Sequence, residues 1–327
     1  MTDEAKKLLV VKDLKVHFYT ARGTAKALDG VNLEIGRAET YGLVGETGCG
    51  KSVTALSIMR LIRPPGKIMG GQIWFEGEEL LEKTEEEMRM IRGSKIAMIF
   101  QEPMTSLNPV YAVGGQVAEP LKIHTSLGKS EILSKAVDLL NLVRMPEPQR
   151  TMTQYPHELS GGMRQRAMIA MMLSCDPSLL ITDEPTTALD VTIQAQILQL
   201  MRELQQKMSS SILLITHDLG IVAEMCHKVA IMYAGQVVES ATVSELFEDP
   251  KHPYTAGLLH AIPKLNQRVR RLEVIPGSVP DLIQSPQGCK FHSRCPRVMD
   301  VCKSKAPTYM KVSEGHYVAC HLYSEKS

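Results

Sequence analysis

The chain has 327 residues, of which 44% are hydrophobic and 22% are charged, and its formal net charge is +1. These values are those of an ordinary globular protein, and the charge gives no overall bias toward nucleic acid. No run approaches about 18 consecutive apolar residues, so no membrane-spanning helix is predicted. Residues 1–7 do not resemble a secretory signal, and we therefore expect a cytosolic protein.

Strand and helix patterns alternate along the first 245 residues. Residues 8–18 and 27–35 predict two paired strands. Shorter apolar runs predict strands at residues 40–44, 96–100, 179–182, 212–216 and 229–233. Helical periodicity occurs at residues 53–61, 130–143, 162–174, 192–208 and 219–226. This alternation predicts a layered α/β core.

Two regions depart from this alternation. Residues 85–165 carry a strand signal only at 96–100, which indicates a helical insertion. Pro and Gly residues between positions 249 and 280 mark a second region that begins near residue 246. We therefore expect one domain at 1–245 and a C-terminal extension at 246–327. The extension holds 12 Lys and Arg against 7 Asp and Glu, which is typical of a solvated face or of an interface with an anionic group.

A Gly-rich sequence lies between the strand at 40–44 and the next helix. It fits the P-loop pattern G-x-x-x-x-G-K-[ST] and reads Gly45-Glu46-Thr47-Gly48-Cys49-Gly50-Lys51-Ser52. Glycines let backbone N–H groups surround phosphate oxygens, and the following helix adds its N-terminal dipole. Lys51 would contact the β and γ phosphates, and the Ser52 hydroxyl would contact Mg²⁺. The sequence therefore predicts a nucleoside triphosphate site.

Cys49 allows two interpretations. Loop amides and Lys51 would lower the pKa of its thiol and make it oxidisable, or the position would simply tolerate a small residue.

A pair of carboxylates ends the predicted strand at 179–182. Phosphoryl transfer depends mainly on positioning and on neutralising charge. Asp183 is placed to order the shell of Mg²⁺, and Glu184 is placed to act on the attacking water. This arrangement predicts a Walker B strand.

Four further motifs accompany the P-loop and the Walker B strand. They occur in the order found in the ATP-binding subunits of ABC transporters, and the chain therefore resembles that family. The resemblance covers about residues 8–245 and implies an ABC-type P-loop NTPase core with an N-terminal antiparallel β subdomain and a helical signature subdomain. The further motifs are similar to the Q-loop glutamine, the signature, the D-loop and the switch histidine, at Gln101, Leu159-Ser160-Gly161-Gly162-Met163, Ala188-Leu189-Asp190 and His217.

The resemblance implies a head-to-tail pair of subunits. The start of the signature helix, with Ser160, Gly161 and Gly162, would then face the γ-phosphate held by the other subunit. Glu184 would polarise the attacking water, and His217 would hold the water and the γ-phosphate in line.

Two further roles follow from the same resemblance. Gln101 would contribute to catalysis and to the Mg²⁺ shell. An aromatic residue near the end of the first strand would stack on adenine, with Phe18 as the best match and Tyr19 as the alternative.

Three segments are similar to the oligopeptide and dipeptide importer ATPases within this superfamily. They are residues 100–109, 185–196 and 252–255. The resemblance implies uptake of peptides, with nickel and antimicrobial-peptide uptake as alternatives in the same group. The implied partners are a second ATPase subunit (a paralogue or a second copy), two membrane permeases and, indirectly, an extracytoplasmic peptide-binding protein.

The implied location is the cytoplasmic face of the membrane, as a peripheral subunit. A soluble ABC ATPase that acts on nucleic acid or ribosomes is the alternative from another class. Those proteins usually join two cassettes or carry a long coiled coil, whereas this chain has one copy of each motif. We therefore expect no nucleic-acid partner.

Four of the seven cysteines lie in the last 40 residues, at Cys289, Cys295, Cys302 and Cys320. In a cytosolic chain such a group indicates metal binding more than disulfides. The spacing lacks the paired C-x₂₋₄-C of common zinc sites and differs from ferredoxin runs, so zinc and iron–sulfur both stay open. The importer ATPases carry a similar extension associated with a [4Fe–4S] cluster, and this resemblance favours the cluster.

Overall fold

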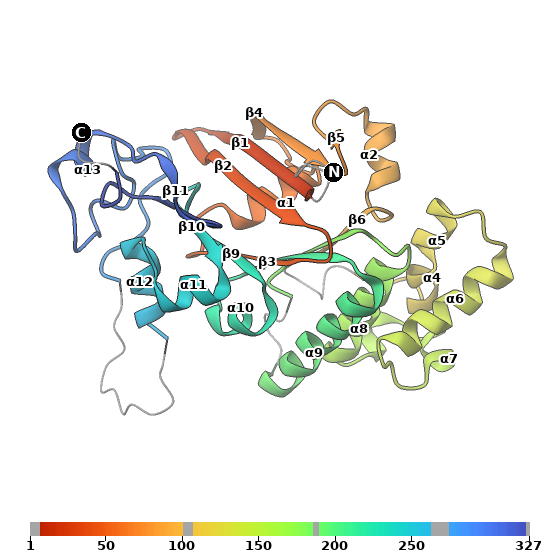
Figure 1. Cartoon of the computed structure of the whole chain (residues 1–327). Helices are drawn as coiled ribbons and strands as arrows, with labels where there is room; N and C mark the ends of the chain where they lie inside the picture. Colours follow the sequence, from red (N-terminus) through yellow and green to blue (C-terminus); the bar gives the residue numbers. More distant parts are fainter. Residues whose placement is uncertain (1–6, 101–106, 186–189, 263–274, 325–327) are drawn as a thin grey trace. The chain divides into compact units, whose positions relative to one another are not determined.

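The computed structural model describes residues 7–100, 107–185, 190–262 and 275–324 (Figure 1). The chain divides into two compact units. The first comprises Met1–Leu8, Ile35–Glu39 and Glu82–Leu214, and the second comprises Leu9–Glu34, Thr40–Leu81 and Ile215–Ser327. The P-loop sequence and the C-terminal extension therefore share one unit, while the signature-like sequence and the acidic pair belong to the other.

The strands of the first unit run in the order β8-β7-β6, at Ser211–Thr216, Leu179–Asp183 and Ile96–Ile99. The last two residues of β8 belong to the second unit. β6 and β7 are parallel, with Ile96 opposite Leu179. Every residue of the three strands is buried, as expected for continuously apolar parallel strands.

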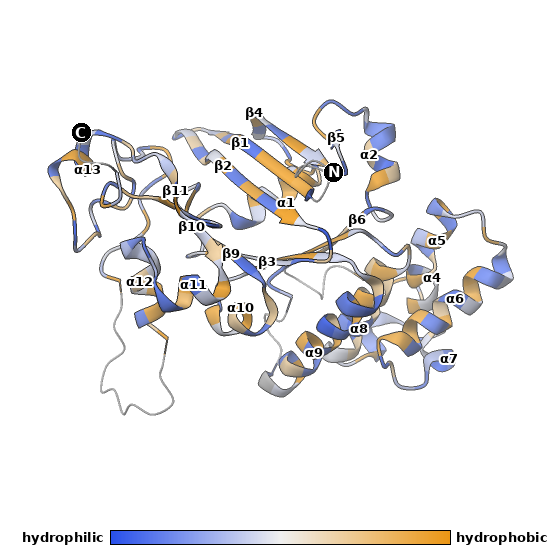
Figure 2. Cartoon of the chain, in the orientation of Figure 1, coloured by the Kyte–Doolittle hydropathy of each residue, from blue (hydrophilic) through white to orange (hydrophobic). Residues whose placement is uncertain are grey.

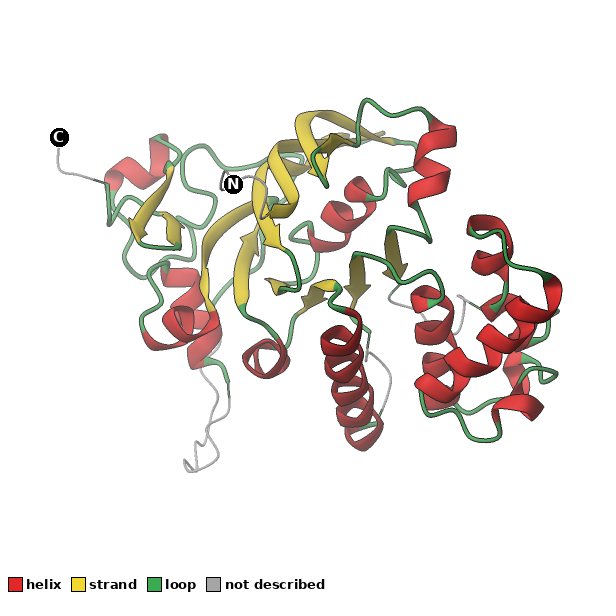
Figure 3. Ribbon diagram, turned by 45° about the vertical axis from the view of Figure 1, so that its right-hand side comes forward, coloured by secondary structure: helices red, strands yellow, loops and turns green. Residues whose placement is uncertain are grey.

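Helices make up most of the first unit. From Val113 to Leu173 the described chain forms helices without strands (Figures 1 and 3), and this stretch overlaps the helical insertion expected at residues 85–165. The buried residues of α6 recur at helical spacing, so one side of the helix is apolar and the other polar (Figure 2). The helices are α2 Glu85–Ile91, α4 Val113–Val117, α5 Glu119–His124, α6 Lys129–Leu142, α7 Pro148–Thr151, the 3₁₀ helix η2 Pro156–Glu158, α8 Gly161–Leu173 and α9 Val191–Met208.

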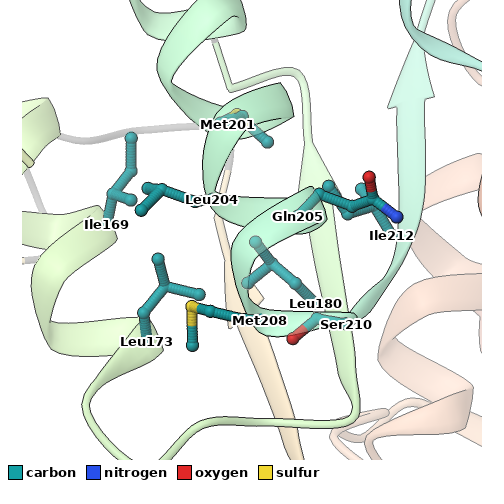
Figure 4. A pocket seen from close by; sticks show the side chains of 9 residues that line it. All are labelled: Ile169, Leu173, Leu180, Met201, Leu204, Gln205, Met208, Ser210 and Ile212. Carbon is teal, nitrogen blue, oxygen red and sulfur yellow. The ribbon is translucent and has the colours of Figure 1, made fainter. Parts of the chain in front are cut away.

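A small cavity lies within the first unit among α8, α9, β7 and β8. Figure 4 shows its lining, which is mostly apolar: Ile169, Leu173, Leu180, Met201, Leu204, Gln205, Met208, Ser210 and Ile212. Its volume of about 10 Å³ is that of roughly one water molecule. The amide of Gln205 donates to Ala38 O, and the Ser210 hydroxyl donates to Pro177 O. The cavity is therefore a packing void in an apolar core.

The second unit contains an antiparallel sheet in the order β2-β1-β4-β5. β1 (Lys7–Thr20) and β2 (Gly23–Gly36) extend the two predicted strands by a few residues at each end. β4 (Gly66–Phe75) pairs with β1 and with β5 (Glu78–Glu79). Our sequence analysis does not predict β4, because three glycines interrupt its apolar pattern.

The second sheet of this unit has the order β11-β12-β10-β9-β3. β3 (Thr40–Val44) is parallel to β9 (Lys228–Tyr233), and β9 is antiparallel to β10 (Gln236–Thr242). The C-terminal region adds β12 (His316–Ala319) beside β10 and β11 (Tyr309–Ser313) at the edge. The extension therefore continues this sheet. Its strands escape sequence analysis because they are short, and most of the β11 side chains are partly or fully exposed.

The helices of the second unit are α1 Lys51–Ile58, α10 Leu219–Met225, α11 Val243–Glu248, α12 Pro253–His260 and α13 Asp300–Ser304. The rings of Tyr233, Tyr254 and Phe291 meet in the core of this unit, with centroids 4.7–5.3 Å apart. They join β9, α12 and the Cys-containing segment of the extension. Among the described residues, none of the helices is both long and apolar enough to cross a membrane.

Candidate nucleotide site

The P-loop sequence lies in the predicted strand–loop–helix setting, between β3 and α1. Gly50 precedes the helix with a φ of 108°, in the left-handed region that favours glycine. A Cβ at this position would lie 2.7 Å from Leu28 Cδ2 and 2.9 Å from Ala27 O, so a larger residue does not fit. At Gly48, by contrast, a Cβ would meet nothing within 4 Å. The loop is therefore closely packed at Gly50 and open beside Gly48.

The Lys51 ammonium group lies inside the loop. Its Nζ donates to Gly45 O at 2.7 Å and to Glu46 O at 3.2 Å, and the side chain is buried. Ser52 follows at the second position of the helix and is half-buried. A positive charge and a helix N-terminus together form an anion-binding site of the kind that phosphates occupy.

The thiol of Cys49 is fully buried behind the loop. Burial raises its pKa above the usual value, and the nearby Lys51 charge offsets this effect only in part. The interpretation of Cys49 as a reactive thiolate is therefore wrong. The sequence shows which charged residues are adjacent to Cys49, but it does not show how deeply the sulfur is buried.

Glu46 has contacts that sequence analysis does not predict. Its carboxylate forms an ion pair with Arg294, with NH1–Oε2 and NH2–Oε1 distances of 2.7 and 2.9 Å. Its backbone N–H donates to the hydroxyl oxygen of Tyr254 at 3.0 Å. In the sequence, Arg294 is only one of several positive charges in the C-terminal extension, and nothing links it to Glu46.

The predicted Walker B residues end β7 in the first unit. Asp183 is the last, buried residue of the strand. Glu184 follows with a φ of 47°, a left-handed conformation that costs a non-glycine residue about 1 kcal/mol. The buried Gln165 amide of α8 donates to Pro185 O at 2.6 Å, and this bond ties the turn after β7 to the signature helix.

The signature-like sequence forms the N-terminus of α8. Ser160 caps the helix, since its Oγ accepts a hydrogen bond from the backbone N–H of Met163 at 3.3 Å. Arg164 fixes the preceding turn by donating to Leu159 O and Pro156 O. Ser160 is exposed, while Gly161 and Gly162 are half-buried. This helix start is open at the surface of its unit.

The remaining predicted residues are dispersed. His217 is exposed directly after β8. Phe18 is half-buried against Gly66, whereas Tyr19 is 44% exposed with the Lys67 ammonium 5.9 Å from its ring centroid. Gln101 and residues 188–189 lie outside the described residues, and Asp190 caps α9.

The four C-terminal cysteines lie near one another in the second unit. The Cys289 N–H donates to Cys302 O at 2.8 Å. Burial raises the pKa of Cys289 to about 11, and charges on Cys302, Cys320 and Cys295 would raise it further. Within the described residues, however, no group of three or more His, Cys, Asp or Glu is arranged to hold a metal ion.

Comparison with known proteins identifies two families along the chain. Residues 28–187 match the ABC transporter family, and residues 238–302 match the oligopeptide/dipeptide transporter C-terminal region. The chain is 52% identical to the oligopeptide transport ATP-binding protein AppD of Bacillus subtilis, over 98% of both chains. It is 48% identical to the dipeptide transport ATP-binding protein DppD of Escherichia coli, over 96% of both chains.

Solved structures give the same result for the fold. The dimeric ATP-binding cassette MJ0796, bound to ADP and phosphate, is similar with a TM-score of 0.65 and 25% identity. The match covers 72% of this chain and 98% of that one. CbiO1 of Clostridium perfringens has a TM-score of 0.63 at 27% identity, over 75% of this chain and 92% of that one. The chain belongs to the ATP-binding proteins of ABC transporters, in the family of oligopeptide and dipeptide transport.

Proposed function

We propose that this protein is the ATP-hydrolysing subunit of an ABC importer that takes up dipeptides or oligopeptides. The observation that carries the proposal is the 52% identity to AppD over 98% of the chain, because this match includes the C-terminal region as well as the cassette. The P-loop geometry supports nucleotide binding. The protein works at the cytoplasmic face of the membrane, as a peripheral subunit.

The proposed nucleotide chemistry begins with phosphate and metal binding. The loop from Gly45 to Ser52, including Thr47, binds the phosphates, and Lys51 neutralises their charge. Ser52, Gln101 and Asp183 would hold Mg²⁺, which adds positive charge at the phosphates. A buried carboxylate at a strand end and a hydroxyl at a helix start are oxygen donors that Mg²⁺ prefers.

Hydrolysis requires an activated and positioned water. Glu184 polarises this water, and His217 holds it in line with the γ-phosphate, with Gln101 as a further contact. Phe18 stacks on adenine. The exposure of Tyr19 supports the alternative assignment, and exchanging each aromatic residue in turn for leucine distinguishes the two.

A second subunit completes the site. The open N-terminus of α8 with Ser160, Gly161 and Gly162 presents a helix dipole to the γ-phosphate bound by its partner. ATP binding closes this dimer, and closure drives the two permeases. The partner is a paralogous ATPase or a second copy of this chain, and a peptide-binding protein delivers the cargo outside the cell.

Uptake measurements in a deletion strain test this proposal. Cells without the gene should lose accumulation of a labelled dipeptide or oligopeptide, and the wild-type gene but not Glu184→Gln should restore it. Loss of nickel or antimicrobial-peptide uptake, with normal peptide uptake, would establish one of the alternative cargoes. Normal uptake of all three, with a growth defect in translation, would favour a soluble ATPase that acts on nucleic acid or ribosomes.

We also propose that Cys289, Cys295, Cys302 and Cys320 are ligands of a [4Fe–4S] cluster, with zinc as the alternative. Four thiols are the donors that such a centre needs, they lie close enough for their charges to act on one another, and the positive charge of Arg297 acts on Cys295 and Cys320. The described residues form no group of three or more ligands arranged around a metal, and this holds for zinc as much as for the cluster, so the choice between them rests on metal analysis. When bound, the cluster would supply a redox-active cross-link of the extension.

Anaerobic purification with iron, sulfide and zinc analysis tests this assignment. About four iron and four sulfide per chain would support the cluster, and Cys302→Ser should then abolish it. One zinc per chain would replace it with a structural zinc site. Metal-free protein with unchanged folding would contradict both assignments.

A further inference from the structure

Arg294 of the C-terminal extension contacts the phosphate-binding loop directly. Its guanidinium group forms the two-pronged ion pair with Glu46, the second residue of the P-loop sequence. The Arg294 side chain is only 5% exposed, and 248 positions separate the two residues in the chain. A buried bidentate pair fixes geometry more strictly than a surface ion pair does.

Arg294 is itself held from several sides. Its Nε donates to Pro276 O at 2.9 Å, and its NH2 donates to Ile275 O at 3.3 Å. The guanidinium carbon lies 5.7 Å from the ring centroid of Tyr233 and 6.0 Å from that of Phe291. The extension therefore presents a pre-oriented cation to the loop.

Three of the contacts of Glu46 join it to Arg294, Tyr254 and Lys51, and two of these come from the extension. Arg294 binds its carboxylate, and the hydroxyl of Tyr254 on α12 accepts a hydrogen bond from its backbone N–H. The third contact is with Lys51, whose Nζ donates to the carbonyl oxygen of Glu46. A shift of Glu46 would therefore move a partner of the lysine that neutralises phosphate charge.

A second ion pair joins the extension to the wall of the same loop. Lys290 is 7% exposed, and its Nζ lies 2.9 Å from Asp29 Oδ2 and donates to Ala234 O at 2.9 Å. Asp29 follows Leu28, the residue that a Cβ at Gly50 would touch. The extension therefore acts on both ends of the loop, directly at Glu46 and through the strand that holds Leu28 and Asp29 at Gly50.

We propose that the C-terminal extension raises nucleotide affinity through Arg294, a positioning residue that neutralises the Glu46 carboxylate in the phosphate-binding loop. This inference rests on the proposed function, because it names a regulator of that same nucleotide site. The extension and the cassette then contribute jointly to nucleotide binding. Arg294 directly precedes Cys295, so a change in the Cys-containing segment acts on the same contact.

The direction of the effect follows from charge. Without Arg294, the Glu46 carboxylate would be an uncompensated negative charge in a loop that binds a polyanion, and like charges repel. We expect Arg294→Ala to weaken ATP binding about tenfold. Removing the Glu46 charge as well should relieve the repulsion, so R294A/E46Q should recover to within about threefold of the wild type.

A fluorescence titration of the full-length chain with a labelled ATP analogue and Mg²⁺ tests this inference. The variants are R294A, E46Q and R294A/E46Q, with R150A as the control, because Arg150 forms an exposed ion pair with Glu147 at 3.3 Å. Unfolding temperatures without nucleotide are measured alongside. If R294A does not fold, R294Q replaces it, since Gln removes the positive charge but can still donate hydrogen bonds.

Weaker binding by R294A, recovery in the double variant and unchanged binding by R150A would support the inference. A merely structural role for Arg294 predicts no recovery, since E46Q does not restore its contacts with Ile275 and Pro276. Equal affinity of R294A and the wild type, or a double variant as weak as R294A, would overturn the inference while leaving the proposed function intact. A wild-type chain that binds no ATP would overturn both.

Discussion

The two helix N-termini that we propose as phosphate contacts, those of α1 and α8, have different surroundings. At the start of α1 a buried lysine lies inside the loop, and the same chain surrounds that loop with Tyr254 and Arg294. At the start of α8 the capping Ser160 is exposed. The first end is completed by its own chain, while the second is open to another molecule. Under the proposed function, one subunit would bind nucleotide and hydrolysis would need a partner.

The largest effect should come from Lys51→Ala, which removes the charge at the enclosed helix end. We expect ATP hydrolysis to fall at least about 10²- to 10³-fold, with nucleotide binding lost as well. Phosphate release and nucleotide titration measure the two effects. Hydrolysis near the wild-type rate would show that α1 is not the phosphate site.

Ser160→Asp should affect the open helix end without disturbing its fold. Asp caps helices as well as Ser does, but its charge would repel the γ-phosphate of the partner subunit. We expect hydrolysis to fall about 10²-fold while the isolated chain binds ATP normally. Reduced ATP binding by the monomer would mean that α8 acts within its own chain, against the contrast drawn above.

Acid should destabilise the fold through His252, which caps α12 ahead of Tyr254, the residue that contacts the loop at the enclosed end. Burial lowers the pKa of His252 to about 4, although the Glu239 charge acts in the opposite direction. Between pH 6.5 and 4 the unfolded chain therefore binds more protons at this residue, and stability falls as the pH falls. From pH 7 to 5 the free energy of unfolding should drop by about 2 kcal/mol from this residue.

The control for this effect is His252→Asn, which keeps a capping group but does not titrate in this range. Urea unfolding at both pH values should show a smaller pH dependence for the variant. An equal dependence in both proteins would assign the acid sensitivity to other groups.

The smallest effect should come from Arg164→Ala at the open end. The two hydrogen bonds that Arg164 donates hold the turn before α8, and their loss should cost about 1 kcal/mol of stability. Thermal unfolding measures this change. A decrease of several kcal/mol in the free energy of unfolding would mean that the turn before α8 contributes as much to stability as the contacts around the P-loop.

Much of the core fold follows from local patterns. The strands at β1, β2, β3, β6, β7, β8 and β9 and the helices α1, α6, α8, α9 and α10 are predicted to within a few residues, because apolar periodicity and glycine placement act over short distances. β4 and β10 to β12 are not predicted. Their patterns are short, interrupted by glycine or half-exposed, and pairing with other strands stabilises them.

The sequence by itself determined the P-loop, the acidic pair at the end of β7 and the start of the signature helix, because each motif is a continuous segment whose chemistry depends on adjacent residues. Only the tertiary structure decided that Cys49 is buried and that Arg294 neutralises Glu46. Burial depends on atoms from many segments, and residues 248 positions apart meet only when β9, α12 and the extension pack together. Long-range contacts of this kind leave no periodic trace in the chain.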